Sequence, residues 1–312
     1  MKRPGCSVIL PTYNRIKTLP RAVASVLAQD EPDFELIIVD DGSTDETPAW
    51  LDTLDDPRIR RARCERNQGP SAARNIGIKL ANAPVLAFLD SDDIYCPNRL
   101  SRPLAVLAAE PDVVCTLSSS RKEDKRGQAR AASLPAAKLA SPAFEWAMLA
   151  DLVHVESTSI SVRTEQAVMA GGFDTTLRRT EDREFLIRLA RLGALRILPE
   201  MLFEKAWSPD GLSNEWAGAG RDLIPFFRAR REYLGAYRKL GHYLATKILV
   251  MHIRHRDLPS LVADVRRFRA AGVLDAGVTR LWRDHLEVKR YRRAHARAEA
   301  LAALSGPPTD WA

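Results

Sequence analysis

Three carboxylates directly follow a short apolar run in the first third of the chain. Residues 85–89 read Val-Leu-Ala-Phe-Leu, and Asp90, Asp92 and Asp93 come after them. The apolar run predicts a strand buried on both faces, as in a parallel sheet covered by helices. In such sheets ligands bind beyond the carboxyl ends of the strands. Because side chains alternate along an extended chain, we expect Asp90 and Asp92 to point to the same side.

Two converging carboxylates suit a hard divalent cation. We expect Mg²⁺ or Mn²⁺ at Asp90 and Asp92, with the phosphate oxygens of a nucleotide diphosphate completing its shell. The alternative is a solvated turn that caps the next helix, and the acidic segment alone does not decide between the two. Its position after a buried strand favours the ligand site.

The segments before this site are predicted to alternate between strands and helices. Strands are expected at residues 6–10, 34–39, 58–64 and 85–89, and helices at 19–27, 50–54 and 71–81. Pro11 is expected to end the first strand. This order predicts an α/β protein with a doubly wound parallel sheet.

Two further charged residues stand where ligands are expected. Asp40 ends the second strand, where it could accept a hydrogen bond from a base or a ribose hydroxyl. Arg74 lies near a helix start, a place suited to an anion. The alternatives, a cap residue for Asp40 and a surface charge for Arg74, stay open when each residue is taken singly.

Four motifs together resemble family 2 glycosyltransferases, the inverting group with the GT-A fold. They are Val8–Arg15, Ile38–Asp45, Gly69–Asn75 and Phe88–Asp93, in the family's order. The resemblance implies a nucleotide diphosphate sugar as donor, most readily a UDP-sugar, and an Asp-x-Asp pair at Asp90 and Asp92 that meets the metal. The residues that the resemblance assigns to nucleotide-sugar binding are Pro11, Thr12, Tyr13, Arg15, Asp40, Arg74, Asp90 and Ser91.

The second half of the chain is less regular. Strands are expected at 112–117 and 157–163, and the polar, alanine-rich stretch 118–138 between them is expected to be a mobile surface excursion. A loop over the site, an acceptor contact and a variable insert are all compatible with that stretch. A helix is expected to follow Thr180 as its N-cap, with acids in the first turn where they favour the helix dipole.

Those acids also carry a resemblance. Gly172-Phe173-Asp174 followed by Glu181-Asp182 is similar to the family's acceptor-side motif, which implies that Asp182 is the general base. Inversion is a single displacement in which a positioned carboxylate takes the acceptor hydroxyl's proton. Many relatives place a His where this chain has Ser208, which puts a third metal ligand in doubt. Trp207 and Trp216 are candidates for stacking on a sugar or for packing.

Charge is unevenly distributed along the 312 residues, whose formal net charge is +7. Residues 221–312 carry +10 and the preceding 220 carry −3. The C-terminal third is predicted to form two to four amphipathic helices with basic outer faces. Docking on anionic lipid, nucleic-acid binding and a solvated helical cap are the three interpretations of that region.

Cysteines and apolar segments limit the class of protein. The four cysteines are widely spaced without a Cys-x-x-Cys pair, so neither structural zinc nor a disulfide framework is expected. The first residues lack a signal-peptide core, and no apolar stretch has the roughly 18–20 residues needed to cross a bilayer. We expect a cytoplasmic protein, at most peripheral on the inner face of the membrane.

The combined prediction is a GT-A-type α/β fold, with a doubly wound, mostly parallel sheet, helices on both faces and a C-terminal helical extension. We expect a catalytic domain at 1–220, with a donor half at 1–117 and an acceptor half at 139–220, and a basic extension at 221–312. The predicted activity is metal-assisted transfer of a sugar to a hydroxyl of a glycan or lipid-linked glycan, without a nucleic-acid partner.

Two other functions are carried as alternatives. A sugar-nucleotide nucleotidyltransferase would use a similar sheet, but it predicts a glycine-rich basic loop after the first strand, which residues 11–14 do not form. The second alternative is a non-catalytic module that binds a membrane surface or nucleic acid through its basic tail.

Overall fold

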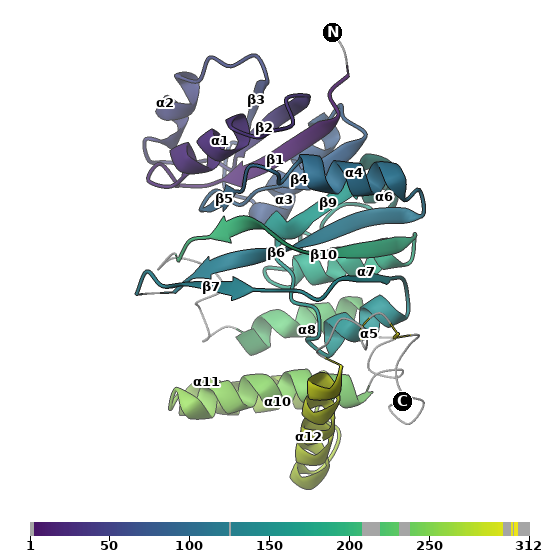
Figure 1. Ribbon diagram of the computed structural model, residues 1–312. Helices are drawn as coiled ribbons and strands as arrows, with labels where there is room; N and C mark the ends of the chain where they lie inside the picture. Colours follow the sequence, from purple (N-terminus) through teal and green to yellow (C-terminus); the bar gives the residue numbers. More distant parts are fainter. Residues whose placement is uncertain are drawn as a thin grey trace.

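The computed structural model describes residues 3–124, 126–207, 219–230 and 238–295, together with 301, 303 and 304. These residues form one ten-stranded sheet whose main path runs β3-β2-β1-β4-β9-β6-β10-β5. Figure 1 shows the first strands, with α1 and α2, at one end of the molecule and α10, α11 and α12 at the other. The sheet therefore lies between the N-terminal helices and the C-terminal ones.

The first part of the sheet is wholly parallel, as predicted. Its strands are β1 (Cys6–Thr12), β2 (Phe34–Asp40), β3 (Ile59–Arg63) and β4 (Val85–Phe88). The helices around it are α1 (Leu19–Leu27), α2 (Thr47–Asp52), α3 (Pro70–Leu80) and α4 (Ser101–Ala109). Val8 and Leu10 pack with α1 in one core cluster, while Ile9 and Ile37 face the side on which α3 packs. Helices on both faces explain why β1, β2 and β4 are buried throughout.

The expectation that Pro11 ends the first strand is wrong, because β1 continues to Thr12. Ile9 accepts a hydrogen bond from Leu89 on the β4 side, whereas Thr12 accepts one from Asp41 on the β2 side. Pro11 alternates with Thr12 and so turns its nitrogen toward β4, whose pairing with β1 already ends at Ile9. The missing N–H thus removes no sheet hydrogen bond.

Beyond β4 the sheet becomes mixed. β9 (Ile160–Arg163) runs antiparallel between β4 and β6 (Val113–Glu123), and β10 (Ala194–Lys205) runs parallel to β6. β5 (Asp93–Tyr95) pairs antiparallel with β10 at the end of the path. The strand expected at 157–163 is shorter, because 157–159 form a 3-10 turn, η1.

The stretch 118–138 is not the mobile excursion that we expected. Its first residues extend β6 to Glu123, and β7 (Ala129–Ala132) and β8 (Ala137–Leu139) pair with β6 and β10. The polar composition misled the prediction because these segments are strands through their pairing with neighbouring strands rather than through their own hydrophobicity.

The helices of this half are α5 (Ala143–Leu149), α6 (Thr164–Met169) and α7 (Glu181–Ala190). Phe88 of β4 meets Phe173 edge-to-face with ring centroids 5.2 Å apart, and Phe173 packs on Phe185 of α7 at 4.4 Å. This aromatic row fixes α7 and the turn before it beneath the end of β4.

The C-terminal region is helical within the described residues, as predicted. Its helices are α8 (Ala219–Ala229), α10 (Arg238–Arg254), α11 (Leu258–Ala270) and α12 (Val278–Ala294). Their core is continuous with Trp146 of α5 and Ile187 of α7. His242 and His252 are buried and pair with Asp284 and Asp264 at 2.6 and 2.9 Å. Among the described helices none is long and apolar enough to cross a membrane.

Candidate active site

The carboxyl ends of β1 and β2 bring two predicted nucleotide-binding residues side by side. Thr12 pairs with Asp40 in the parallel register, and both side chains are buried. One Asp40 oxygen accepts a hydrogen bond from the Ser43 amide at 2.9 Å, and the other lies 3.4 Å from Arg63 Nε without a hydrogen bond among the described residues. The Thr12 hydroxyl likewise has no hydrogen-bond partner within the described ranges. Two buried polar groups at this edge therefore have capacity for a ligand.

The other residues assigned to the nucleotide lie near the same edge. Pro11 is the residue before the end of β1, Tyr13 follows the strand with 41% of its surface exposed, and Ser91 is buried in the acidic segment. Arg15 lies close enough to lower the pKa of Asp90 by its positive charge. The predicted set is thus gathered along the ends of β1, β2 and β4.

Residues 90–93 form what we call the acidic turn. The Asp93 amide donates to the Asp90 carbonyl at 3.0 Å, so this segment is bent and not extended. The reason given for Asp90 and Asp92 pointing to one side is therefore wrong. Their carboxylates nevertheless lie close enough to interact. The pKa of Asp92 is raised, first by burial and then by the negative charge of Asp90.

Thr158 of η1 holds the acidic turn in place. Its hydroxyl donates to Asp93 at 2.6 Å and accepts from the Asp90 amide at 3.1 Å. Asp93 is 1% exposed, and burial raises its pKa well above the usual range. Asp93 thus anchors the turn, while Asp90 and Asp92 remain partly exposed.

Arg74 joins the acidic turn to the acceptor-side motif. Its Nη2 lies 2.7 Å from an Asp90 oxygen, and its Nη1 lies 3.2 Å from a Glu181 oxygen. The side chain is 4% exposed and its guanidinium lies over the Phe173 ring. Arg74 is therefore a buried bridge between the two motifs and not a surface charge, and it reaches Glu181 from 107 residues away in sequence.

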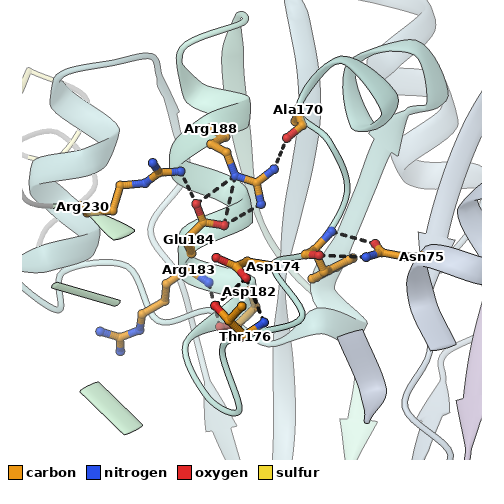
Figure 2. A network of polar contacts seen from close by, with 10 residues as sticks. Asn75, Ala170, Asp174, Thr176, Asp182, Arg183, Glu184, Arg188 and Arg230 are labelled. Atoms are coloured by element: carbon orange, nitrogen blue, oxygen red, sulfur yellow. Dashed lines mark hydrogen bonds and ion pairs between the residues drawn. The ribbon is translucent and has the colours of Figure 1, made fainter. Parts of the chain in front are cut away.

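The neighbouring Asn75 fixes that bridge. Its side-chain amide donates to the Phe173 carbonyl and accepts from the Phe173 amide, both at 2.8 Å, as Figure 2 shows. Gly172 has a φ of +69°, and a Cβ there would lie 2.4 Å from the Asn75 side-chain oxygen. Only glycine allows both this backbone and this close approach. The turn before α7 is thus attached to α3.

Asp182 lies in the first turn of α7, partly buried, and one of its oxygens accepts from the Arg183 amide at 2.7 Å. Burial and the charge of Asp90 raise the pKa of Asp182, although the Arg183 charge opposes them. Thr180 is the N-cap residue, but its hydroxyl donates to the Arg179 carbonyl and caps nothing. A carboxylate with a raised pKa near the acidic turn is suited to accept a proton.

The rest of α7 is held by a buried ion-pair network. Glu184 is 2% exposed and pairs with Arg188 on the same helix and with Arg230 beyond α8 (Figure 2). Arg188 also donates to the Ala170 carbonyl. The network fixes the helix that carries Asp182 against both neighbouring segments.

Lys205, at the carboxyl end of β10, is a site residue that the sequence analysis did not identify. Burial disfavours its charge, but the carboxylates of Asp93, Glu156, Asp90 and Asp92 raise its pKa. Its Nζ lies 3.7 Å from a Glu156 oxygen. No local motif could have revealed Lys205, because the antiparallel pairing of β10 with β5, in which Lys205 lies opposite Asp93, brings it to the acidic turn.

The acidic turn fits the predicted cation in part. Asp90 and Asp92 supply two hard carboxylate groups, and Asp92 forms no ion pair with any described Lys or Arg. No group of three or more His, Cys, Asp or Glu that could hold a metal occurs in the described residues. Two carboxylates match the usual protein share of a Mg²⁺ site completed by phosphates. Ser208 and Trp216 lie outside the described residues.

With this geometry in place, the family of the chain can be stated. Residues 7–170, more than half of the chain, match the sequence profile described as "Glycosyl transferase family 2". The chain belongs to that family, which confirms the resemblance of its motifs.

Curated relatives match over limited lengths. The chain is 44% identical over 101 residues to the succinoglycan biosynthesis protein ExoO of Rhizobium meliloti, which is 32% of this chain and 29% of ExoO. It is 42% identical over 104 residues to the putative colanic acid biosynthesis glycosyl transferase WcaA of Escherichia coli, covering 33% and 37%. The match thus spans less than two fifths of either relative.

A solved structure resembles the fold over nearly the whole chain. S. aureus TarS 1-349, crystallised in complex with UDP-GlcNAc, has a TM-score of 0.66 and 21% identity, covering 95% of this chain and 89% of that one. The likeness supports the arrangement of sheet and helices, including the helical C-terminal region.

Proposed function

We propose that this protein transfers a sugar from a nucleotide diphosphate sugar, most readily a UDP-sugar, to a hydroxyl of a glycan or lipid-linked glycan, with inversion. The observation that carries the proposal is the buried Arg74 bridge, because it brings the acidic turn and the Glu181-Asp182 pair to one place. Family membership supports the reaction class, and the polysaccharide-related names of ExoO and WcaA support a glycan acceptor.

The residues divide the reaction between them. Thr12 and Asp40 would hold the nucleoside, and Arg74 orients Asp90 next to the diphosphate. Asp182 would accept the acceptor hydroxyl's proton as the new glycosidic bond forms and the bond to the diphosphate breaks. A Mg²⁺ or Mn²⁺ ion held by Asp90 and Asp92 would neutralise the charge of the leaving group. No covalent intermediate is required.

A thermal-shift panel tests the donor class. We expect one nucleotide diphosphate sugar to raise the unfolding temperature selectively in the presence of Mn²⁺, because a ligand that binds only the folded state stabilises it. The same assay with a nucleoside triphosphate and a sugar phosphate addresses nucleotidyl transfer, which would also release pyrophosphate. Stabilisation by no sugar nucleotide would contradict the proposal.

We propose in addition that the C-terminal helices dock on an anionic lipid surface. Val278, Trp282 and Leu286 follow one another at intervals of four along α12, with 67%, 45% and 49% of their surfaces exposed. Lys289 and Arg293 continue the same stripe, and both are exposed. An apolar stripe containing Trp and ending in cations is typical of helices that lie in the membrane interface. Such docking would place the enzyme peripherally on the membrane and suit a lipid-linked acceptor.

Vesicle sedimentation tests this docking. We expect binding to vesicles containing phosphatidylglycerol, weaker binding to pure phosphatidylcholine, and a clear loss in the variant Trp282→Ser with Leu286→Ser. Val168→Ser with Met169→Ser, exposed apolar residues on α6, is the matched control. Equal binding by the two variants would contradict a docking role for α12.

A further inference from the structure

A small cavity at the carboxyl end of β6 has no role in the reaction described so far. It measures about 220 Å³ and is lined by Ser118, Ser120, Ala132, Ser133, Leu134, His154, Glu156 and Ser159. At about 30 Å³ per water molecule, it has room for about seven waters. That is the size of a single sugar ring and too small for a nucleotide.

Two polar groups that line the cavity lack partners. Ser118 is 3% exposed, and its hydroxyl has no hydrogen-bond partner among the described residues. The His154 ring also makes no hydrogen bond within the described part of the chain, and partial removal from water together with the Lys122 charge lowers its pKa to about 4. At neutral pH this imidazole is uncharged and offers one donor and one acceptor. His154 is exposed, so its ring can pair with water, whereas an unpaired hydroxyl as buried as that of Ser118 is uncommon and points to a ligand that pairs with it.

The remaining lining selects against other ligand classes. Glu156 is ionised, with Lys122 at 2.8 Å and Lys205 at 3.7 Å, and it accepts a hydrogen bond from Ser120 at 3.2 Å. This carboxylate disfavours an anion, and its charge is already balanced by two lysines. No Phe, Tyr or Trp lines the cavity, so the His154 ring is the one group in the lining on which a base could stack. Hydroxyls, a neutral imidazole and a carboxylate fit a neutral polyhydroxyl molecule.

The cavity lies close to the acidic turn. Glu156, which lines it, lies 3.7 Å from the Nζ of Lys205, and Lys205 faces Asp90 and Asp92. β6 is also separated from β1 and β2, where the nucleoside would bind, by β4 and β9.

We infer that this cavity is the subsite for the acceptor sugar, and that Ser118 and His154 determine which sugar it takes. The inference rests on the proposed glycosyltransferase function. The Lys205–Glu156 pair links the cavity to the acidic turn, so an acceptor ring in the cavity would lie beside the donor diphosphate. Figure 1 shows β7, which flanks the cavity, on the side of the molecule that faces the C-terminal helices. A lipid-linked acceptor would approach from that side.

Saturation-transfer NMR with methyl glycosides of glucose, galactose, mannose and N-acetylglucosamine tests the inference without requiring turnover. In the presence of UDP and Mg²⁺, we expect at least one glycoside to bind the wild-type protein. Ser118→Ala and His154→Ala are each expected to weaken that binding by about fivefold to tenfold, the effect of one lost hydrogen bond. Thr116→Val is the matched control, because Thr116 is also buried in β6 with an unpaired hydroxyl but does not line the cavity.

The outcomes separate the two proposals. Binding that Ser118→Ala leaves unchanged, binding that Thr116→Val weakens equally, or binding of no glycoside would each overturn the acceptor subsite alone. Competition between the glycoside and the intact sugar nucleotide, but not UDP, would instead assign the cavity to the donor sugar and also overturn it. A protein that no sugar nucleotide stabilises would contradict the proposed function itself.

Discussion

The two parts of the sheet differ in how their strands are specified. In the parallel part, β1, β2 and β4 are buried along their whole length, and their sequences are continuous apolar runs. In the mixed part, β6 ends in Ser-Ser-Ser-Arg-Lys-Glu and is a strand only because β7 and β10 pair with it. The comparison shows that the donor half is encoded locally, whereas the acceptor half depends on long-range pairing.

Arg74 is the point at which the two halves meet. It reaches Asp90 in the donor half and Glu181 in the acceptor half from α3. If the account is right, the two halves can be disabled separately by removing Asp92 or Asp182, and together by removing Arg74. The following predictions use this contrast, beginning with the largest expected effect.

Asp182→Asn disables the acceptor half alone. The amide cannot take a proton, so we expect the transfer rate to fall by about 10²–10⁴-fold. Donor affinity, measured by calorimetry, is expected to stay within about twofold because the donor half is untouched. Asp174→Asn, in the turn before α7, is the control for local disturbance. Wild-type turnover in Asp182→Asn would show that another group is the base.

Arg74→Met breaks the connection between the halves. It leaves Asp90 and Glu181 without their buried partner, so we expect the free energy of unfolding to drop by about 3–5 kcal/mol. Arg102→Met removes an ion pair with Glu200 in which both side chains are well exposed, and it is expected to cost about 1 kcal/mol or less. Urea denaturation compares the two variants. Similar losses in both would mean that the Arg74 bridge is not a buried structural link.

Asp92→Ala disables the donor half alone. We expect the affinity for the donor in the presence of Mn²⁺ to fall at least about tenfold, since even changes to outer-shell residues of metal sites have effects of that size. Donor affinity without Mn²⁺ is expected to change little. Calorimetric titrations with and without Mn²⁺ measure both quantities, and identical metal dependence in variant and wild type would rule out Asp92 as a ligand.

Glu181 makes the connection sensitive to pH. Burial and the neighbouring Asp182 raise the pKa of Glu181 to about 7 from its ordinary 4.5. Between pH 4.5 and 7 the Glu181 carboxyl is protonated in the folded protein but largely ionised in the unfolded chain. The stability that this bound proton contributes is therefore lost as the pH rises through 7. We expect the stability of wild type relative to Glu181→Gln to decrease by about 1–3 kcal/mol from pH 5 to pH 8. Parallel pH profiles would contradict this role.

The sequence predicted the donor half closely and the acceptor half only in outline. The strands at β1, β2, β3 and β4 and the ordered motifs follow from local patterns. The family was recognisable for the same reason. The bend at residues 90–93 was missed because a hydrogen bond from Asp93 to Asp90 and the hydroxyl of Thr158, a distant residue, create it.

Partners that come together only in the folded sheet could not be foreseen. Lys205 reaches the acidic turn because β10 pairs with β5, and Arg74 reaches Glu181 because Asn75 binds the Phe173 backbone. Neither relation leaves a pattern in nearby sequence. The structure adds that the residues with assigned roles lie near one another, but the roles themselves remain predictions. These residues are Asp40, Arg74, Asp90, Asp92 and Asp182.

The most direct measurement is the anomalous scattering of Mn²⁺ in crystals grown with UDP and MnCl₂. The account predicts one Mn²⁺ peak at the carboxylates of Asp90 and Asp92, in contact with the diphosphate, and the uracil at the ends of β1 and β2 near Asp40. An ordered UDP whose diphosphate lies away from these carboxylates, or a Mn²⁺ peak at an unrelated surface, would contradict it.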